Sequence, residues 1–128
     1  MNVTMGADPV NQLSDLLSQI RQPARLQILL IIGADETCVC HIEAILGLRQ
    51  AAISQHLMAL RKAGLLVTRR DGRHIYYRLA NPEVTDLLHH AGALAGIPAE
   101  ALDYFSSHPY PGCTCPQCNP EPGKDPIC

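Results

Sequence analysis

The chain has 128 residues and a hydrophobic content of 47%, enough for one folded domain with a modest core and a short appendage. Its longest apolar run, around Leu26 to Ile32, is far too short to cross a bilayer, and the N-terminal MNVTMGADPV lacks the basic and apolar regions of an export signal. We therefore predict a cytoplasmic protein without a membrane partner. The net charge of −2 hides a basic middle, since residues 49–78 hold seven basic residues and one acidic residue, a local charge of +6.

Two helices are expected in the first quarter of the chain. Leu13, Leu16, Leu17 and Ile20 recur at helical spacing with polar residues between them, which predicts an amphipathic helix. A second helix should begin at Pro23 and stop at Gly33. Because this second segment is apolar on most sides, we expect it to be buried.

The middle of the chain predicts a helix-turn-helix followed by a hairpin. A short helix fits 39–46, ending at Gly47, and a second fits 51–63, closed by Gly64. In LLVTRRDGRHIYYRLA the Asp71-Gly72 pair predicts a two-residue turn between two strands. In the second strand Ile75, Tyr77 and Leu79 should face the core, whereas His74, Tyr76 and Arg78 should face water. The fold class is therefore mainly α with a β-hairpin, a winged helix-turn-helix.

After Asn81-Pro82 a last long helix is expected over 83–95, with a shorter helical turn over 98–105. Its apolar stripe comprises Val84, Leu87, Leu88, Ala91 and Leu94. Six of the ten prolines follow Ser106, which excludes regular structure there. We predict one domain over 1–105 and a Pro/Cys-rich tail over 106–128. The first and last long helices are either a homodimer surface or simply part of the monomer core.

The second helix of the pair carries short polar side chains that suit a DNA major groove, and the hairpin arginines suit phosphates or a minor groove. Basic residues alone are also compatible with an ordinary solvated surface, but their combination with helix, turn, helix and hairpin favours double-stranded DNA as partner. The predicted DNA-binding residues are Arg49, Gln50, Ser54, Gln55, His56, Arg61, Arg69, Arg70 and Arg73.

Six cysteines form two clusters and a terminal residue: Cys38 and Cys40, then Cys113, Cys115 and Cys118, then Cys128. In a reducing compartment clustered thiols bind metal or carry redox chemistry more often than they form structural disulfides. Two cysteines separated by one residue lie about 200° apart on a regular helix, so they can share an ion only if the first precedes the helix. A helix N-terminus would also favour the thiolate.

The tail spacing C-x-C-x-x-C closes small loops at little entropic cost, so tail cysteines can join Cys38 and Cys40 in one site. Three sulfurs would suit As(III), Pb(II) or Cd(II), and four would suit Cd(II) or Zn(II). The site would lie within one subunit or across a dimer. His41 is expected at the surface, close enough for an auxiliary role, and His89, His90 and His108 are expected to be bystanders.

Several alternatives remain open at this point. Cys38 and Cys40 could be small buried apolar residues, and the thiols could sense oxidants or persulfides. CTCPQC could form a structural zinc knot with Cys128, in which case the protein would be a constitutive or redox-responsive DNA-binding regulator. An enzyme with a reactive cysteine is a further alternative. Against it, no C-x-x-C precedes a helix in a βαβ context, and no Ser, His and acid grouping is apparent.

The runs RQPARLQILLII and ETCVCHIEAILGLRQAAISQHLMALRKAGLLVTRRDGRHIYYRL resemble the ArsR/SmtB family of bacterial metal-sensing repressors, and the resemblance extends over about 13–94. It implies a homodimeric repressor that leaves its operator when an inducer binds. The CVC segment matches the ligand positions of members that sense thiophilic ions. Where some arsenite sensors have a third cysteine, this chain has Glu43. Asn81, Glu83, Leu94 and Ile97 match poorly the zinc ligands that other members carry after the wing, so no zinc site is expected there.

Overall fold

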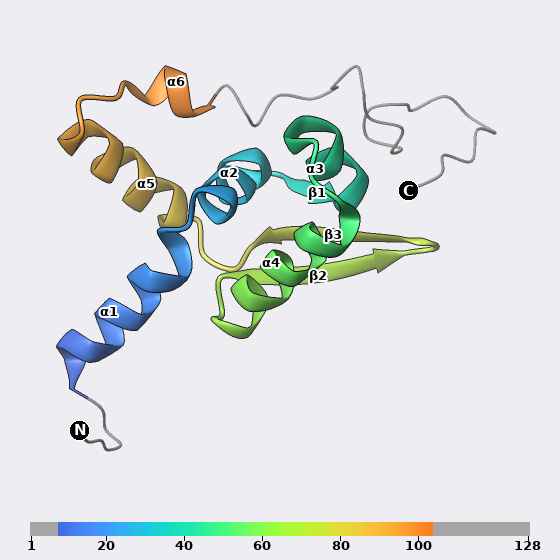
Figure 1. Ribbon diagram of the computed structural model, residues 1–128, viewed down its shortest axis with the longest axis horizontal. Coiled ribbons are helices and arrows are strands. Elements are labelled where there is room, and N and C mark those ends of the chain that lie inside the picture. The colour runs from blue at the N-terminus through green and yellow to red at the C-terminus, as the bar shows by residue number, and fades with distance from the viewer. Residues whose placement is uncertain (1–7, 104–128) are drawn as a thin grey trace.

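The computed structural model describes residues 8–103, and its elements lie around a central buried helix, α2 (Figure 1). The predicted tail at 106–128 lies outside the described residues. None of the described helices is both long and apolar enough to cross a membrane. In chain order the elements are α1 Pro9–Ile20, α2 Pro23–Ile32, β1 Glu36–Cys38, α3 Val39–Leu46, α4 Gln50–Lys62, β2 Leu66–Asp71, β3 His74–Leu79, α5 Glu83–Leu94 and α6 Ala99–Asp103.

Local signals in the sequence set the bounds of the first two helices. The Asp8 carboxylate caps α1 by accepting a hydrogen bond from the backbone N–H of Val10 at 2.9 Å. Pro23 begins α2, and Gly33 ends it with a φ of 54° that disfavours any other residue type. Both predicted helices are confirmed.

The core surrounds α2, which is buried on most sides as its composition predicted. Ile28, Ile31 and Ile32 are all 0% exposed. Ile42 of α3 and Ile53, Leu57 and Leu60 of α4 complete the centre of the cluster. The helix-turn-helix is therefore anchored on α2 through the apolar faces of both its helices.

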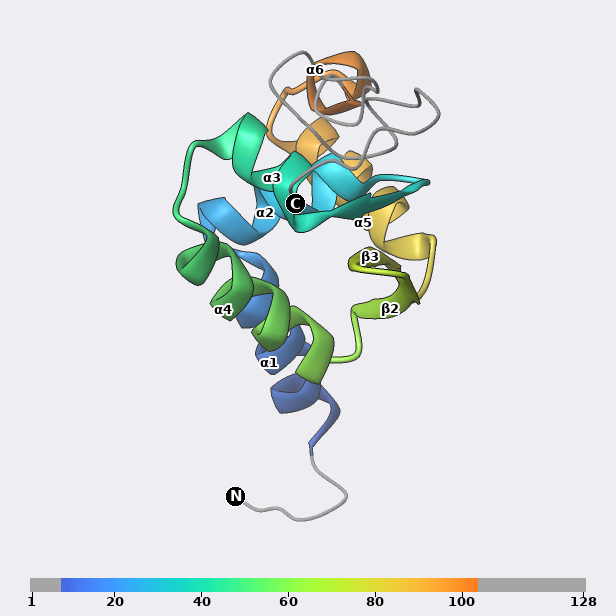
Figure 2. The same ribbon diagram turned by 90° about the vertical axis from the view of Figure 1, so that its right-hand side faces the viewer.

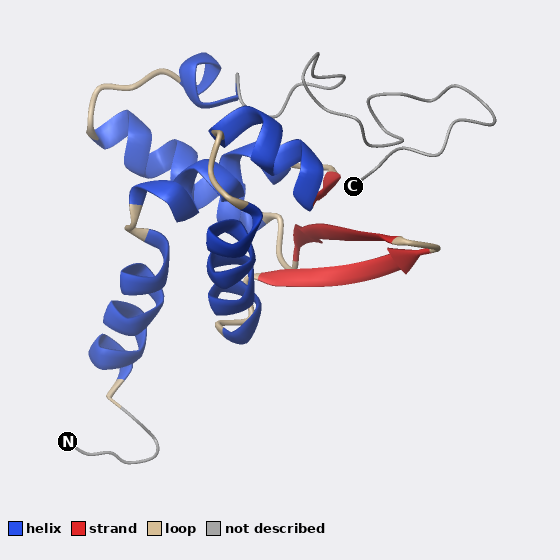
Figure 3. Ribbon diagram, turned by 45° about the vertical axis from the view of Figure 1, so that its right-hand side comes forward, coloured by secondary structure: helices blue, strands red, loops and turns tan. Residues whose placement is uncertain are grey.

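The sheet has three strands in the order β1-β3-β2, all antiparallel. The hairpin of β2 and β3 projects away from the helical body, on the side opposite α1 and α5 (Figures 1 and 3). Strand β1 was not predicted, because a three-residue strand has too little pattern to be recognised and exists only through its pairing with β3. The two-residue loop is Gly72 and Arg73 rather than Asp71-Gly72, since Asp71 already pairs with His74. Gly72 has a φ of 63°, as the first position of a type II′ turn requires.

The predicted alternation of the second hairpin strand is wrong at two positions. Tyr76, expected in water, is only 4% exposed, whereas Ile75, expected in the core, is 37% exposed. The reason is that β1 pairs with β3 beside Tyr76 and α3 packs over this face of the sheet, where Tyr76 contacts Cys38, Cys40 and Ala44. A second, smaller apolar cluster therefore lies between the hairpin and the start of α3.

Helices α5 and α6 follow the hairpin, as predicted. Val84 and Leu88 are buried, but Leu87 is 38% and Leu94 is 92% exposed, so only part of the predicted stripe contributes to the monomer core. On α1, Val10, Leu13 and Leu17 are likewise exposed. Two long helices thus present apolar surface that the other described residues leave exposed.

Candidate DNA-binding surface and thiol site

Helix α4 is held by its partner α3 across a three-residue turn. The turn begins at Gly47, whose φ of 69° lies in the left-handed region and whose N–H donates to the carbonyl of Glu43 at 2.8 Å. The chain changes direction at this turn and enters α4 after Arg49. Because Ile53, Leu57 and Leu60 face inward, the opposite face of α4 points to solvent.

That outer face carries short polar and basic side chains, as the prediction required. Gln50, Ser54, Gln55 and Arg61 are exposed, as is the preceding Arg49. Sequence reasoning missed two members of this face, Met58, which is 57% exposed, and the exposed Lys62. Their spacing from Ser54, four and eight residues along a helix, was the signal that should have identified them. A thioether at the centre of such a face can contact a thymine methyl.

His56 points away from this face. It is half-buried, and its Nδ1 accepts a hydrogen bond from Nε of Arg25 at 3.3 Å, so that α4 is tied to α2. Arg25 also donates from Nη1 to the side-chain carbonyl of Gln19 at 2.7 Å. Burial, and then the nearby Arg25 charge, lower the pKa of His56 below its ordinary value. The geometry assigns His56 to helix packing rather than to the exposed surface.

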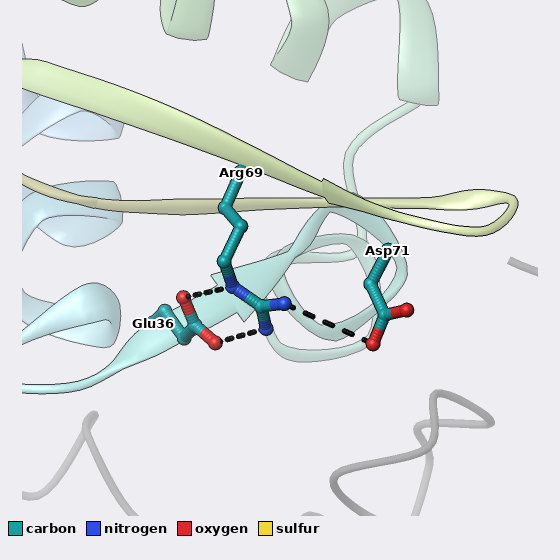
Figure 4. A network of polar contacts seen from close by, with 3 residues as sticks. All are labelled: Glu36, Arg69 and Asp71. Atoms are coloured by element: carbon teal, nitrogen blue, oxygen red, sulfur yellow. Dashed lines mark hydrogen bonds and ion pairs between the residues drawn. The ribbon is translucent and has the colours of Figure 1, made fainter.

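The hairpin arginines divide into two groups. Arg70 and Arg73 are exposed near its tip. Arg69, with 49% of its side chain exposed, instead turns toward β1: its Nε donates to Glu36 Oε2 at 3.1 Å and its Nη2 bonds Glu36 Oε1 (Figure 4). The guanidinium also lies 4.8 Å from the centroid of the Tyr76 ring. This hydrogen bond to Arg69 is the main reason that the pKa of Glu36 is lowered.

Cys38 and Cys40 lie where the chain passes from strand to helix. Cys38 ends β1 and precedes α3 with an extended backbone, φ −95° and ψ 168°, and Cys40 is the second residue of α3. This confirms that the backbone is not yet helical at Cys38, so the 200° separation of a regular helix does not apply. Cys38 is 1% exposed and outside any disulfide, whereas Cys40, half-buried in the same cluster, takes part in a disulfide bond.

The described residues do not by themselves form a complete metal site. Within residues 8–103 no three His, Cys, Asp or Glu side chains are grouped so as to hold an ion. His41, expected at the surface, is 0% exposed, because it lies on the side of α3 that packs into the body of the domain. The predicted ligands Cys113, Cys115, Cys118 and Cys128 lie outside the described residues. As donors, two sulfurs beside a helix N-terminus suit a thiophilic ion, but such ions take three or four ligands.

His89 does more than its expected role as bystander. Its Nε2 lies 2.7 Å from the Asp103 carboxylate, which joins α5 to α6. Its ring borders a cavity of about 350 Å³ together with Leu29, Gly33 and Thr85. Neither histidine of α5 is close to the thiol pair in the sequence or in the contacts described.

Comparison with known proteins identifies relatives of this arrangement. The family described as "Bacterial regulatory protein, arsR family" matches residues 22–68. A biofilm growth-associated repressor of Agrobacterium fabrum is 38% identical over 87 residues, 68% of this chain and 74% of that protein. A SmtB homologue of Synechocystis, described as a transcriptional repressor, is 34% identical over 83 residues; these are 65% of this chain but only 63% of that protein.

An arsenic resistance transcriptional regulator, ArsR1 of Pseudomonas putida, is 52% identical over 56 residues, 44% of this chain and 43% of that protein. Among solved structures, HlyU from Vibrio cholerae superposes with a TM-score of 0.61 at 33% identity, covering 66% of this chain and 92% of HlyU. The relatives are transcriptional regulators, and the enzyme alternative is discarded. The helix-turn-helix, its hairpin wing and these matches together establish that the chain belongs to the ArsR/SmtB family of bacterial transcriptional regulators.

Proposed function

We propose that the protein is a homodimeric cytoplasmic repressor that binds operator DNA and releases it when a thiophilic ion binds its cysteine thiolates. The domain over 1–105 would bind DNA and dimerise, and the tail over 106–128 would contribute ligands. The ion would be As(III), Cd(II) or Pb(II), with Zn(II) as a further candidate. The arsenic resistance role in the name of ArsR1 supports this choice of ion class.

DNA binding would place the outer face of α4 in the major groove. Ser54, Gln55 and Met58 can reach base edges there, while Arg49, Gln50 and Arg61 flank them. Arg70 and Arg73 at the hairpin tip would bind phosphates or enter the adjacent minor groove. Two copies related by two-fold symmetry would read paired half-sites, because one such helix covers few base pairs.

The observation that carries the sensing proposal is that both cysteines pack into one cluster. Cys38 and Cys40 belong to one small cluster with Tyr76 of the hairpin, although a regular helix would separate them. In the reduced protein both would offer thiolates at the N-terminus of α3, and one or two tail cysteines among Cys113, Cys115, Cys118 and Cys128 would complete the ligand set. An ion held there would neutralise the sulfur charges.

Position also supports the coupling between ion and operator. Cys38 is hydrogen-bonded into the sheet opposite Tyr76, and it directly precedes α3, which packs against α4. Displacing Cys38 and the start of α3 would therefore affect both the hairpin wing and α4. Coupling free energies of about 1–3 kcal/mol are usual and change affinity about 5- to 150-fold.

Cys38→Ser tests the thiol site. Fluorescence anisotropy with an operator duplex should show that As(III), Cd(II) or Pb(II) weakens binding of the reduced wild-type protein by about 5- to 150-fold. The variant should bind the operator normally without ion and lose that response. Val39→Ala, which changes the same segment but keeps both sulfurs, should remain inducible. A full ion response in folded Cys38→Ser would refute the thiol site.

The contribution of the tail is tested by ending the chain after Ser107. If tail sulfurs complete the site, the truncated protein should bind less ion per subunit and show fewer sulfur ligands by X-ray absorption than the intact chain. Equal stoichiometry and equal sulfur coordination would show that the tail is not part of the site.

A redox switch is the second candidate, and the disulfide at Cys40 favours it. A thiol at this position that alternates between reduced and oxidised states would alter the same cluster without metal. A structure of the related HlyU is described as reduced. Operator affinity compared under dithiothreitol and under diamide, with chelator present, separates the two candidates, because only a redox switch responds there.

A further inference from the structure

Arg69 of the wing is attached to strand β1. Its guanidinium makes two hydrogen bonds to Glu36, lies over the Tyr76 ring and approaches Asp71 Oδ2 at 3.8 Å (Figure 4). Nε and Nη2 together form the edge that arginine uses to grip a planar anion. That edge is occupied by the carboxylate of β1.

Glu36 and Tyr76, which hold Arg69, also lie beside the cysteines at 38 and 40. Glu36 and Cys38 are the first and last residues of the three-residue strand β1. Cys38 is paired with Tyr76, the residue on whose ring Arg69 lies. Arg69 is therefore attached twice to the thiol segment, residues 36–40, once through Glu36 and once through Tyr76. In Figure 2, as in Figure 1, β1 leads directly into α3.

Glu36 occupies Nε and Nη2 of Arg69, and Nη1 on the other edge of the guanidinium faces Asp71 Oδ2 at 3.8 Å. A DNA phosphate that binds Arg69 through Nε and Nη2 must therefore replace the Glu36 carboxylate, so these two interactions compete. The pair is also partly exposed, with 49% of the Arg69 side chain and 24% of the Glu36 side chain accessible. Ion pairs of this kind are weak enough to exchange, whereas a fully buried pair would not open.

We propose that Glu36 is a positioning residue that withholds Arg69 from operator DNA, and that strand β1 thereby passes the state of the thiol segment to the wing. When β1 holds Glu36 in place, Arg69 stays on the sheet; when DNA binds, Arg69 leaves Glu36 for a phosphate. The first part requires only DNA binding. The connection to the thiols rests on the function proposed above.

A double-mutant cycle on operator affinity tests the competition in the absence of ion. Glu36→Gln should tighten binding by up to about 5-fold for each half-site, because Arg69 no longer has to leave a carboxylate. In the Arg69→Gln background the same change should have no effect. Asp35→Asn is the matched control, since it removes an exposed carboxylate from the adjacent residue and should leave affinity within error of wild type.

The alternative to competition is general repulsion between a carboxylate and DNA. In that case Glu36→Gln would tighten binding equally with and without Arg69, and Asp35→Asn would have a comparable effect; either result overturns the proposal. Circular dichroism checks that each variant is folded. Glu36→Ala, which also removes the carboxylate, should likewise tighten operator binding. Weaker or unchanged binding in both Glu36 variants would likewise overturn it.

The ion arm separates this inference from the proposed function. Glu36→Gln should show a smaller fold-change on adding Cd(II) or As(III) than the wild type, and an equal fold-change contradicts the connection between β1 and the wing. If the wild-type protein shows no ion response at all, the thiol function fails, and with it this connection. The ion-free cycle still decides whether Glu36 withholds Arg69.

Discussion

The two half-buried partners His56 and Arg25 show how one residue joins several helices. Arg25 of α2 bonds His56 of α4 and Gln19 of α1, so three helices converge on one guanidinium. Because Nδ1 of His56 accepts the bond from Arg25, the imidazole is neutral with its proton on Nε2. A second positive charge beside Arg25 would be unfavourable.

This pair predicts a pH dependence of stability. The pKa of His56 is lowered in the folded state, so the unfolded chain binds more protons as the pH falls through about 6.5. The contribution of neutral His56 to the free energy of unfolding should therefore be complete above about pH 6.5. It should decrease as the pH falls from there toward the lowered pKa of the folded state. Urea unfolding between pH 5 and 7.5 measures the slope.

His56→Gln keeps a side-chain acceptor for Arg25 but cannot be protonated, so part of that slope should disappear. His90→Gln, at an exposed histidine on α5, controls for the loss of a histidine as such. An unchanged slope in His56→Gln would show that the Arg25 pair does not contribute to it.

Single residues also mark the limit of sequence-based prediction. The exposed face of α4 followed from helical periodicity, because Ile53, Leu57 and Leu60 fix which side is inward. The burial of Tyr76 and His41 did not follow, since it depends on how α3 packs and on the pairing of β1 with β3. Likewise, no local pattern identifies Glu36 as the partner of Arg69, which lies 33 residues away.

At the level of elements, the prediction succeeded for long periodic segments that begin at proline or end at glycine. The helices bounded by Pro23 and Gly33, and by Gly47 and Gly64, appear within one or two residues of their expected ends. The short strand β1 was missed, although it connects the thiols to the wing. Elements of this kind are created by tertiary pairing, so the sequence that forms them is not distinctive.

The contact between α5 and α6 gives a prediction at this scale. A Cβ added at Gly92 would lie 2.8 Å from Cδ1 of Leu102, so in Gly92→Ala the end of the Leu102 side chain must move, which loosens the contact between α5 and α6. Alanine also favours the helix by about 1 kcal/mol, which partly offsets the clash in global stability. Hydrogen exchange should therefore speed up in α6 more than in α2 or α4.

Adding Leu102→Val to Gly92→Ala removes the clashing atom and should slow that exchange again. Exchange in α6 that is unchanged by Gly92→Ala would mean that Leu102 adjusts without moving its helix.

At the level of the whole molecule, the architecture was predictable from the sequence. The sequence indicated only roughly which residues of α1 and α5 are exposed. The order of helix, turn, helix and hairpin determined the winged fold. Which apolar residues of α1 and α5 complete the core and which remain exposed required the packing, as the 92% exposure of Leu94 illustrates. The contribution of the tail cysteines stays a prediction.

The exposed apolar residues test the homodimer proposed above. Leu13 on α1 and Met58 on α4 are exposed to similar extents, 56% and 57%, so they form a matched pair. Leu13→Glu should dissociate the dimer in sedimentation velocity and weaken operator binding, since a buried unpaired charge is costly. Met58→Glu should weaken operator binding but leave the dimer intact. A dimeric Leu13→Glu variant would exclude α1 from the interface.

The 1% exposure of Cys38 has a kinetic consequence. If Cys38 binds the inducing ion as proposed, an arriving ion cannot reach its covered sulfur directly, so binding must wait for a transient fraying of strand β1, which ends at Cys38. Arrival rates should then level off as ion concentration rises, at the frequency of that fraying. A sensor of this kind would respond to sustained exposure to the ion rather than to a brief pulse.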